Sequence, residues 1–157
     1  MKKAILLFLG LSTLFISCDK NDDNAVDNQQ AVLKGKWEVK SYTAEATLNG
    51  QPLPEEDVDF SGVVGTIFEF GPGNKFSATT YDDFDEQWGT ETGTYVYHPS
   101  ENKIMYTFTE SDGSLYTETM NVKLLNQTNF NFNIISEEVD EGDVYKLSMD
   151  VNCEKKN

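Results

Sequence analysis

Few residues of this chain could carry out catalysis. It contains one histidine, two cysteines and 27 acidic residues, and its 12 basic residues are all lysines. The histidine, His98, precedes Pro99, a pair that predicts an exposed turn. No Gly-x-Ser-x-Gly segment supplies a nucleophile, and the many acidic residues single out no carboxylate pair. One histidine and two cysteines also fall short of a Cys/His zinc site. We therefore expect a protein that is not an enzyme, with no catalytic residue, no cofactor and no metal site.

Acidic clusters are the remaining candidates for metal chemistry, because carboxylates bind calcium. Residues 57–62 begin like a calcium-binding loop, with acids at the first and third positions and glycine at the sixth. The twelfth position of such a loop must be a glutamate, and here it is Phe68. Residues 82–86 and 137–143 could each hold Ca²⁺ weakly, although solvated loops of repelling charges are the simpler interpretation.

The charge balance restricts the partners that the protein can have. The formal net charge is −15, and the isoelectric point is about 4.2. Such a charge repels phosphate backbones, which excludes nucleic acid, and no arginine is present to clamp a phosphate or carboxylate at two points. A basic protein would be attracted instead, at a rate that falls with added salt.

Residues 1–17 are predicted to be a signal peptide. Two lysines precede an apolar run over residues 4–16, which is shorter than the roughly 20 apolar residues that span a bilayer. Residues 14–18 resemble a bacterial lipobox, in which a small residue precedes a cysteine. The resemblance implies that Cys18 becomes the lipid-bearing N-terminus of a mature lipoprotein, attached to the membrane through that lipid.

Cys18 has an alternative interpretation. In an ordinary secreted protein cleaved near residue 17, it would be a free thiol or would pair with Cys153. In the lipoprotein, Cys153 would remain unpaired with a structural role.

Residues 18–32 are polar and acidic and show no periodicity, so we expect a flexible tether. A lysine followed closely by acidic residues after the lipid cysteine resembles the surface-export tether of lipoproteins from Bacteroidota. This resemblance implies a protein of the bacterial cell envelope, anchored in the outer membrane and displayed on the cell surface. A linker facing the periplasm is the alternative.

Residues 33–153 are predicted to form one all-β domain, followed by a tail over residues 154–157. Apolar and polar side chains alternate with a period of two, most clearly where phenylalanine and isoleucine alternate with asparagine over residues 129–134. About eight such segments, joined mostly by short turns, predict an antiparallel up-and-down eight-stranded barrel. A two-sheet β-sandwich is the alternative fold.

Several short motifs resemble those of bacterial lipocalin-like lipoproteins of the Bacteroidota type. Gly35-Lys36-Trp37 resembles the Gly-x-Trp signature that opens lipocalins. The Asn-Gly and Pro residues of 48–54 occupy a long first connection, and the aromatic-glycine-aromatic pattern of 68–76 follows it. Residues 93–95 and 124–130 are similar to later strands of that family. Lipocalins stack an arginine on the tryptophan; this chain has none, so we expect Lys146 or an apolar residue to pack there.

The resemblance implies a barrel that binds one small, mostly apolar ligand. Eight strands leave room for a single small molecule, or only for the barrel's own side chains. The alternative is therefore a filled barrel, an interaction or structural lipoprotein whose acidic loops bind a protein partner. Phe84 and Trp88 fall in an acidic connection, where they could form a lid at the barrel mouth or fold back onto the barrel end. The other candidate ligand-binding residues, all expected to face inward, are Trp37, Phe68, Phe70, Phe76, Tyr95, Tyr106, Phe108, Phe130 and Phe132.

Overall fold

The computed structural model describes residues 28–54, 58, 62–82, 86–109 and 113–156. A short helix over residues 28–33 leads into the first strand. The strands, in chain order, are β1 (Gly35–Leu48), β2 (Gln51–Pro52), β3 (Ile67–Phe70), β4 (Lys75–Asp82), β5 (Gln87–His98), β6 (Lys103–Thr109), β7 (Leu115–Leu125), β8 (Asn129–Asp140) and β9 (Asp143–Lys156).

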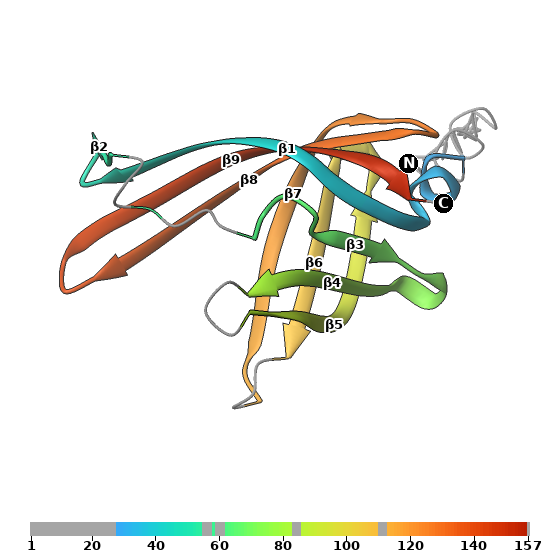
Figure 1. The fold of residues 1–157 in the computed structure, drawn as a ribbon, viewed down its shortest axis with the longest axis horizontal. Coiled ribbons are helices and arrows are strands. Elements are labelled where there is room, and N and C mark those ends of the chain that lie inside the picture. Colours follow the sequence, from blue (N-terminus) through green and yellow to red (C-terminus); the bar gives the residue numbers. More distant parts are fainter. Residues whose placement is uncertain (1–27, 55–57, 59–61, 83–85, 110–112, 157) are drawn as a thin grey trace, which may run out of the picture.

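The strands form a closed antiparallel barrel. From β3 to β9 each strand pairs with the next in the chain, and β1 pairs with both β3 and β9. The two-residue β2 attaches only to the end of β1. Eight strands thus close an up-and-down barrel (Figure 1), as the sequence predicted, and the sandwich alternative is wrong. Because the sheet closes on itself, the closed part of the barrel has none of the exposed strand edges of an open sheet.

Short turns with backbone conformations suited to glycine or asparagine connect the strands. Asn49 and Gly50 have φ angles of 51° and 78°, and Glu141 and Gly142 have φ angles of 49° and 98°. Two consecutive residues with positive φ form the turn whose twist matches that of a β-hairpin. The β8–β9 turn fixes the pairing Asp140↔Asp143 and hence the register of both strands.

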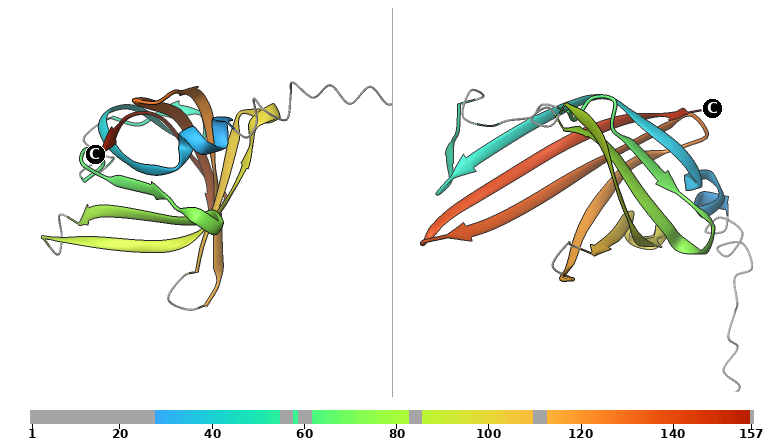
Figure 2. Two further views of the ribbon diagram at one scale, coloured as in Figure 1. Left: turned by 90° about the vertical axis from the view of Figure 1, so that its right-hand side faces the viewer. Right: turned by 60° about the horizontal axis from the view of Figure 1, so that its bottom comes forward.

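Three strands run far beyond the closed part of the barrel. β1 pairs with β3 only over residues 35–38, whereas its pairing with β9 continues to Leu48. β8 similarly leaves β7 after Ile134 but stays paired with β9 to its end. We call residues 41–48 of β1, 134–140 of β8 and 143–150 of β9 the arm; it projects from the barrel in Figures 1 and 2.

The core fills the end of the barrel opposite the arm. Leu33, the last residue of the helix, is completely buried against it, and the Tyr97 hydroxyl donates a hydrogen bond to Oε1 of Gln29, 3.1 Å away. The helix therefore covers this closed end of the barrel. It includes residues 28–32, assigned to the tether from the sequence. Within the described residues, no helix is long and apolar enough to cross a bilayer.

β9 also continues further than expected. Residues 154–156, assigned to a tail from the sequence, pair with Lys36, Trp37 and Glu38 of β1. Charged residues dominate this segment, and their alternation places Cys153 inside and Glu154 outside.

Candidate functional site

The nine aromatic residues expected to face inward line one continuous inner wall. Eight are buried outright, Tyr106 and Phe108 among them, and Phe68 packs against the same cluster while partly exposed. Their rings contact one another at centroid distances from 4.8 Å between Phe130 and Phe132 to 6.0 Å between Phe68 and Phe76. Edge-to-face and tilted contacts at such distances add about 0.5–1.5 kcal/mol per pair beyond the burial itself. The closed half of the barrel is therefore filled by its own rings.

Burial decreases along the inner wall toward the arm. Phe132 is completely buried, whereas Ile134, two residues further on the same face of β8, is only partly buried. Met149, opposite Ile134 on β9, is also partly buried. Alternate residues of a strand share a face, so the arm extends the inner wall beyond the filled core.

A pocket of about 310 Å³ lies on this extension, and we call it the arm pocket. Three strands and the segment that follows β2 form it. Its walls are largely apolar, and the polar groups come from Thr47, Ser136, Glu138, Tyr145 and Lys146. The lining residues are Ala46, Thr47, Leu53, Val58, Ser136, Glu138, Tyr145, Lys146 and Leu147.

One hydrogen-bonded polar pair lies inside the barrel above the aromatic core. Tyr106 and Glu118 are opposite each other on β6 and β7, and the tyrosine hydroxyl donates a hydrogen bond to the carboxylate. Burial raises the pKa of Tyr106, and the nearby carboxylates of Glu118 and Glu91 raise it further. The phenol therefore stays protonated and remains a hydrogen-bond donor to Glu118.

Trp37 joins the helix to the barrel. Its Nε1–H donates a hydrogen bond to the carbonyl oxygen of Leu33, 2.7 Å away. The ammonium of Lys155 lies 4.5 Å from the ring centroid and donates to the carbonyl oxygens of Val32 and Lys34 at 2.8 and 2.6 Å. Because the three carbonyls end the helix, both side chains cap it.

Lys155, rather than Lys146, thus takes the place of the stacking arginine. Lys146 pairs with Thr47 in the arm, at the far end of the ladder that brings Lys155 beside Trp37. The sequence alone does not single out Lys155, because its charged neighbours predict a tail rather than a strand at this position. Burial lowers the pKa of the Lys155 ammonium.

Replacing Lys155 by methionine is expected to lower the free energy of unfolding by about 1–2 kcal/mol, since it removes a cation–π contact and two hydrogen bonds to carbonyls. Lys155→Arg should retain most of this stability because a guanidinium also stacks and donates. Urea unfolding of both variants measures the difference. An equal loss in both would show that the ammonium is not the stabilising group.

Tyr95 carries a buried polar group that no described residue satisfies. The residue is 1% exposed, and its hydroxyl has no hydrogen-bond partner. Burial raises the pKa of this phenol. The ring meets Phe70 edge-on at 5.1 Å, so its packing is retained by phenylalanine.

Tyr95→Phe is accordingly expected to leave the protein as stable or to stabilise it by about 1 kcal/mol, because an unsatisfied buried hydroxyl costs about 1–3 kcal/mol. Thermal unfolding should show an unchanged or raised Tm. Tyr106→Phe is the matched control and should lower the Tm, since Glu118 would lose its hydrogen-bond donor. A lowered Tm for Tyr95→Phe would mean that its hydroxyl is bonded in solution.

Trp88 lies elsewhere than the barrel mouth. It belongs to β5, not to a loop, and pairs with Tyr81 of β4 at a ring distance of 5.4 Å. Its position, an odd number of residues from inward-facing Tyr95, places it on the outer face, where it is 55% exposed. Phe84 lies outside the described residues. Acidic residues around Trp88 suggested a loop, but the cross-strand aromatic pair extends the hairpin.

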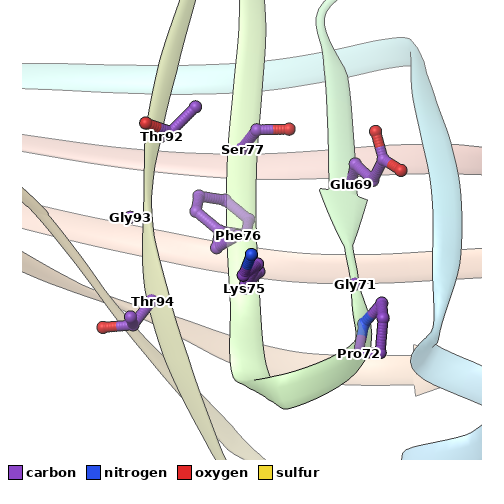
Figure 3. Close-up of a pocket in the computed structure, with 9 residues that line it drawn as sticks. All are labelled: Glu69, Gly71, Pro72, Lys75, Phe76, Ser77, Thr92, Gly93 and Thr94. Atoms are coloured by element: carbon purple, nitrogen blue, oxygen red, sulfur yellow. The ribbon is translucent and has the colours of Figure 1, made fainter.

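A groove of about 630 Å³ crosses the outer face of β3, β4 and β5. Figure 3 shows the side chains of Glu69, Ser77 and Thr92 along its length and Lys75 projecting from β4. Lys36 of β1 lies 3.5 Å from Glu69 as an ion pair. The groove opens on the outer face of the barrel, whereas the arm pocket lies on the continuation of the inner wall.

The described part of the chain offers few side chains that could bind a metal or react as a thiol. No cluster of three or more metal-ligating side chains occurs there, although residues 83–85 of one acidic segment lie outside it. His98 precedes the 3₁₀ turn Pro99–Glu101. Cys153 is a free, completely buried thiol, and burial raises its pKa to about 12, so it carries almost no thiolate at neutral pH.

Comparison with known proteins gives similarity to solved structures only. No family model matches the chain, and no curated protein matches its sequence. A lipocalin-like protein from Bacteroides uniformis is similar with a TM-score of 0.47 and 16% identity, covering 80% of this chain and 99% of that one. An uncharacterized protein from Bacteroides eggerthii is similar with a TM-score of 0.41 and 15% identity, covering 79% of this chain and 99% of that one.

Proposed function

We propose that this protein is an extracytoplasmic lipoprotein that is not an enzyme and whose lipocalin-like barrel binds one small, mostly apolar molecule in the arm pocket. The observation that carries the proposal is the apolar inner wall of the arm, which continues from the core yet stays partly exposed around a 310 Å³ pocket. Small-molecule sites are typically concave, mostly apolar and about 300–1,000 Å³ in volume.

The filled core supports binding at the arm and argues against binding among the aromatic rings. Phe130 and Phe132 are completely buried and contact other rings, so a ligand would have to displace them. Closed packing of this kind is costly to open. The packed core instead closes the base of the arm.

The polar groups of the arm pocket indicate how a ligand would be oriented. Glu138 lies opposite Tyr145, and Ser136 lies opposite Leu147. A ligand with an apolar body would contact Leu147 and Leu53, and one hydrogen-bond donor would meet Ser136 or Glu138. A few placed polar groups in an apolar site fix orientation in this way.

The neutral fluorescent probe N-phenyl-1-naphthylamine tests binding at this pocket. Ala46→Phe fills the pocket and should weaken binding of the probe at least tenfold. Glu45→Phe is the matched control: Glu45 is the preceding residue of β1, is exposed and points to the opposite face, so it should leave the affinity unchanged. Equal affinities for both variants, or no binding by the wild type up to the solubility limit of the probe, would refute the proposed site.

The membrane anchor is tested separately. When the full chain is expressed in a Gram-negative bacterium, it should enter the detergent phase of a Triton X-114 extract, because two or more acyl chains anchor a protein stably. Cys18→Ser should move it to the aqueous phase. Wild-type protein in the aqueous phase would contradict lipidation without bearing on the arm pocket.

A further inference from the structure

One edge of the arm has backbone groups that no described strand pairs with. β7 and β8 are paired from Met120↔Ile134 to Leu125↔Phe130, and beyond Ile134 the two strands diverge (Figure 1). A notch of about 290 Å³ separates them there. Its lining residues are Tyr116, Thr117, Glu118 and Thr119 from β7 and Ile135, Ser136 and Glu137 from β8.

The β8–β9 turn determines which backbone groups face this notch. Asp140 and Asp143 flank a two-residue turn, so they form a hydrogen-bonded pair, and the even-numbered residues of β8 bond to β9. The odd-numbered residues point the other way. The N–H of Ile135 still bonds to β7, because the last pair, Met120↔Ile134, does not exchange hydrogen bonds itself and is flanked by residues that do. The C=O of Ile135 and both backbone groups of Glu137 and Val139 face the notch side with no described partner strand. We call these three residues the open edge.

The side chains of the open edge are apolar at both ends and acidic at the centre. Ile135 is 51% exposed and Val139 is 65% exposed, with Glu137 between them. No described lysine forms an ion pair with Glu137, Glu138 or Asp140. An exposed strand edge of this kind is a template for one more strand.

Charge selects the occupant. A second copy pairing antiparallel through the same edge would place Glu137 of each copy side by side, and like charges directly opposite are destabilising. A basic segment would instead meet Glu137 at the centre of the edge; Glu118 of β7 also lines the notch but accepts a hydrogen bond from Tyr106. The alternate apolar side chains of the segment would meet Ile135 and Val139.

From this geometry we infer that the open edge captures an extended, lysine- or arginine-rich segment of another protein by β-strand addition. The segment takes the place beside β8 that β7 leaves at Ile134. Backbone hydrogen bonds to the C=O of Ile135 and to both backbone groups of Glu137 and Val139 supply the pairing, and the acidic side chains select the charge. The inference does not depend on a ligand in the arm pocket, although Ser136 lines both that pocket and the notch.

The test follows amide hydrogen exchange of the protein by NMR, with the peptide acetyl-Lys-Val-Lys-Thr-Lys-Val-Lys-amide as probe. Without the peptide, the amides of Glu137 and Val139 should exchange fast and those of Ile135, Ser136 and Glu138 slowly. Saturating peptide should slow exchange at the Glu137 and Val139 amides at least tenfold. Binding should weaken about tenfold between 20 and 500 mM salt, because exposed charges are screened.

Matched peptides and variants separate strand addition from charge attraction. The same peptide with N-methyl groups on alternate backbone nitrogens, and its counterpart with glutamate for lysine, should both fail to protect these amides. Glu137→Pro removes only the backbone N–H that faces the notch and should abolish binding. Glu137→Gln should retain binding, with a smaller dependence on salt.

Four results would overturn the inference. They are slow exchange at the Glu137 and Val139 amides in the free protein, equal binding of the N-methylated peptide, protection confined to other strands, or a dimer of the protein alone that Glu137→Pro dissociates. The last result would assign the edge to a second copy of the chain.

Discussion

Replacing Gly93 by alanine is expected to lower the free energy of unfolding by about 3 kcal/mol or more, the upper range for overpacking a core. A Cβ at this position would lie 2.0 Å from the carbonyl oxygen of Thr107 and 3.1 Å from Cδ1 of Phe108. The first contact is with backbone, which no side-chain rotation can relieve. The strands β5 and β6 would have to separate at this point.

Gly89→Ala is the matched control, because Gly89 lies on the same strand and the same face, and its Cβ would meet nothing within 4 Å. Alanine there should leave stability unchanged or raise it by about 0.4–1 kcal/mol through the unfolded state. Urea unfolding at one pH compares the two. Similar midpoints for both variants would show that β5 and β6 are further apart than described.

The position of Gly93 explains why the barrel can close. β5 crosses over the contact between Phe76 and Phe108, whose rings are 5.4 Å apart, and Gly93 pairs with both residues. A side chain at this inner position would compete with these rings for the same volume. Glycine in a strand interior often marks such a close approach or bend.

The alternation of Phe130 and Phe132 with asparagine predicted both a strand and its buried face, and the structure confirms this. Periodicity is local, so the sequence sufficed for the strands, their antiparallel order and the inward rings. It did not predict the arm, because the divergence of β7 from β8 depends on how many residues of each strand find partners. The pocket at Ala46 and Leu147 and the open edge at Glu137 both arise from that divergence.

Two further differences have the same origin. The charged neighbours of Lys155 predict a tail, yet the ladder with β1 brings this residue to Trp37 across more than a hundred residues of sequence. The acids before Trp88 predict a loop, yet pairing with Tyr81 extends β5. In both segments the partner strand determines whether the residues form a strand. The periodicity of a single sequence does not reveal which strands will be partners.

Trp37→Ala is expected to lower the free energy of unfolding by about 3–5 kcal/mol, the usual cost of truncating a fully buried tryptophan. The ring is completely buried, meets Phe130 edge-on at 5.6 Å and donates a hydrogen bond to Leu33. Its loss would also leave Lys155 without the ring on which it lies. A domain with an ordinary stability of about 5–15 kcal/mol would lose roughly a fifth of it or more.

The second tryptophan provides the control and the readout. Trp88→Ala should cost less than about 1 kcal/mol, because a half-exposed ring on the outer face leaves no cavity. The chain has only these two tryptophans, so Trp88→Phe isolates the emission of Trp37, which should be blue-shifted and should shift red on unfolding in urea. Equal costs for Trp37→Ala and Trp88→Ala would contradict a core centred on Trp37. If Trp37→Ala lowers the free energy of unfolding strongly while Lys155→Met leaves it unchanged, the loss comes from the cavity in the core and not from the cap on the helix.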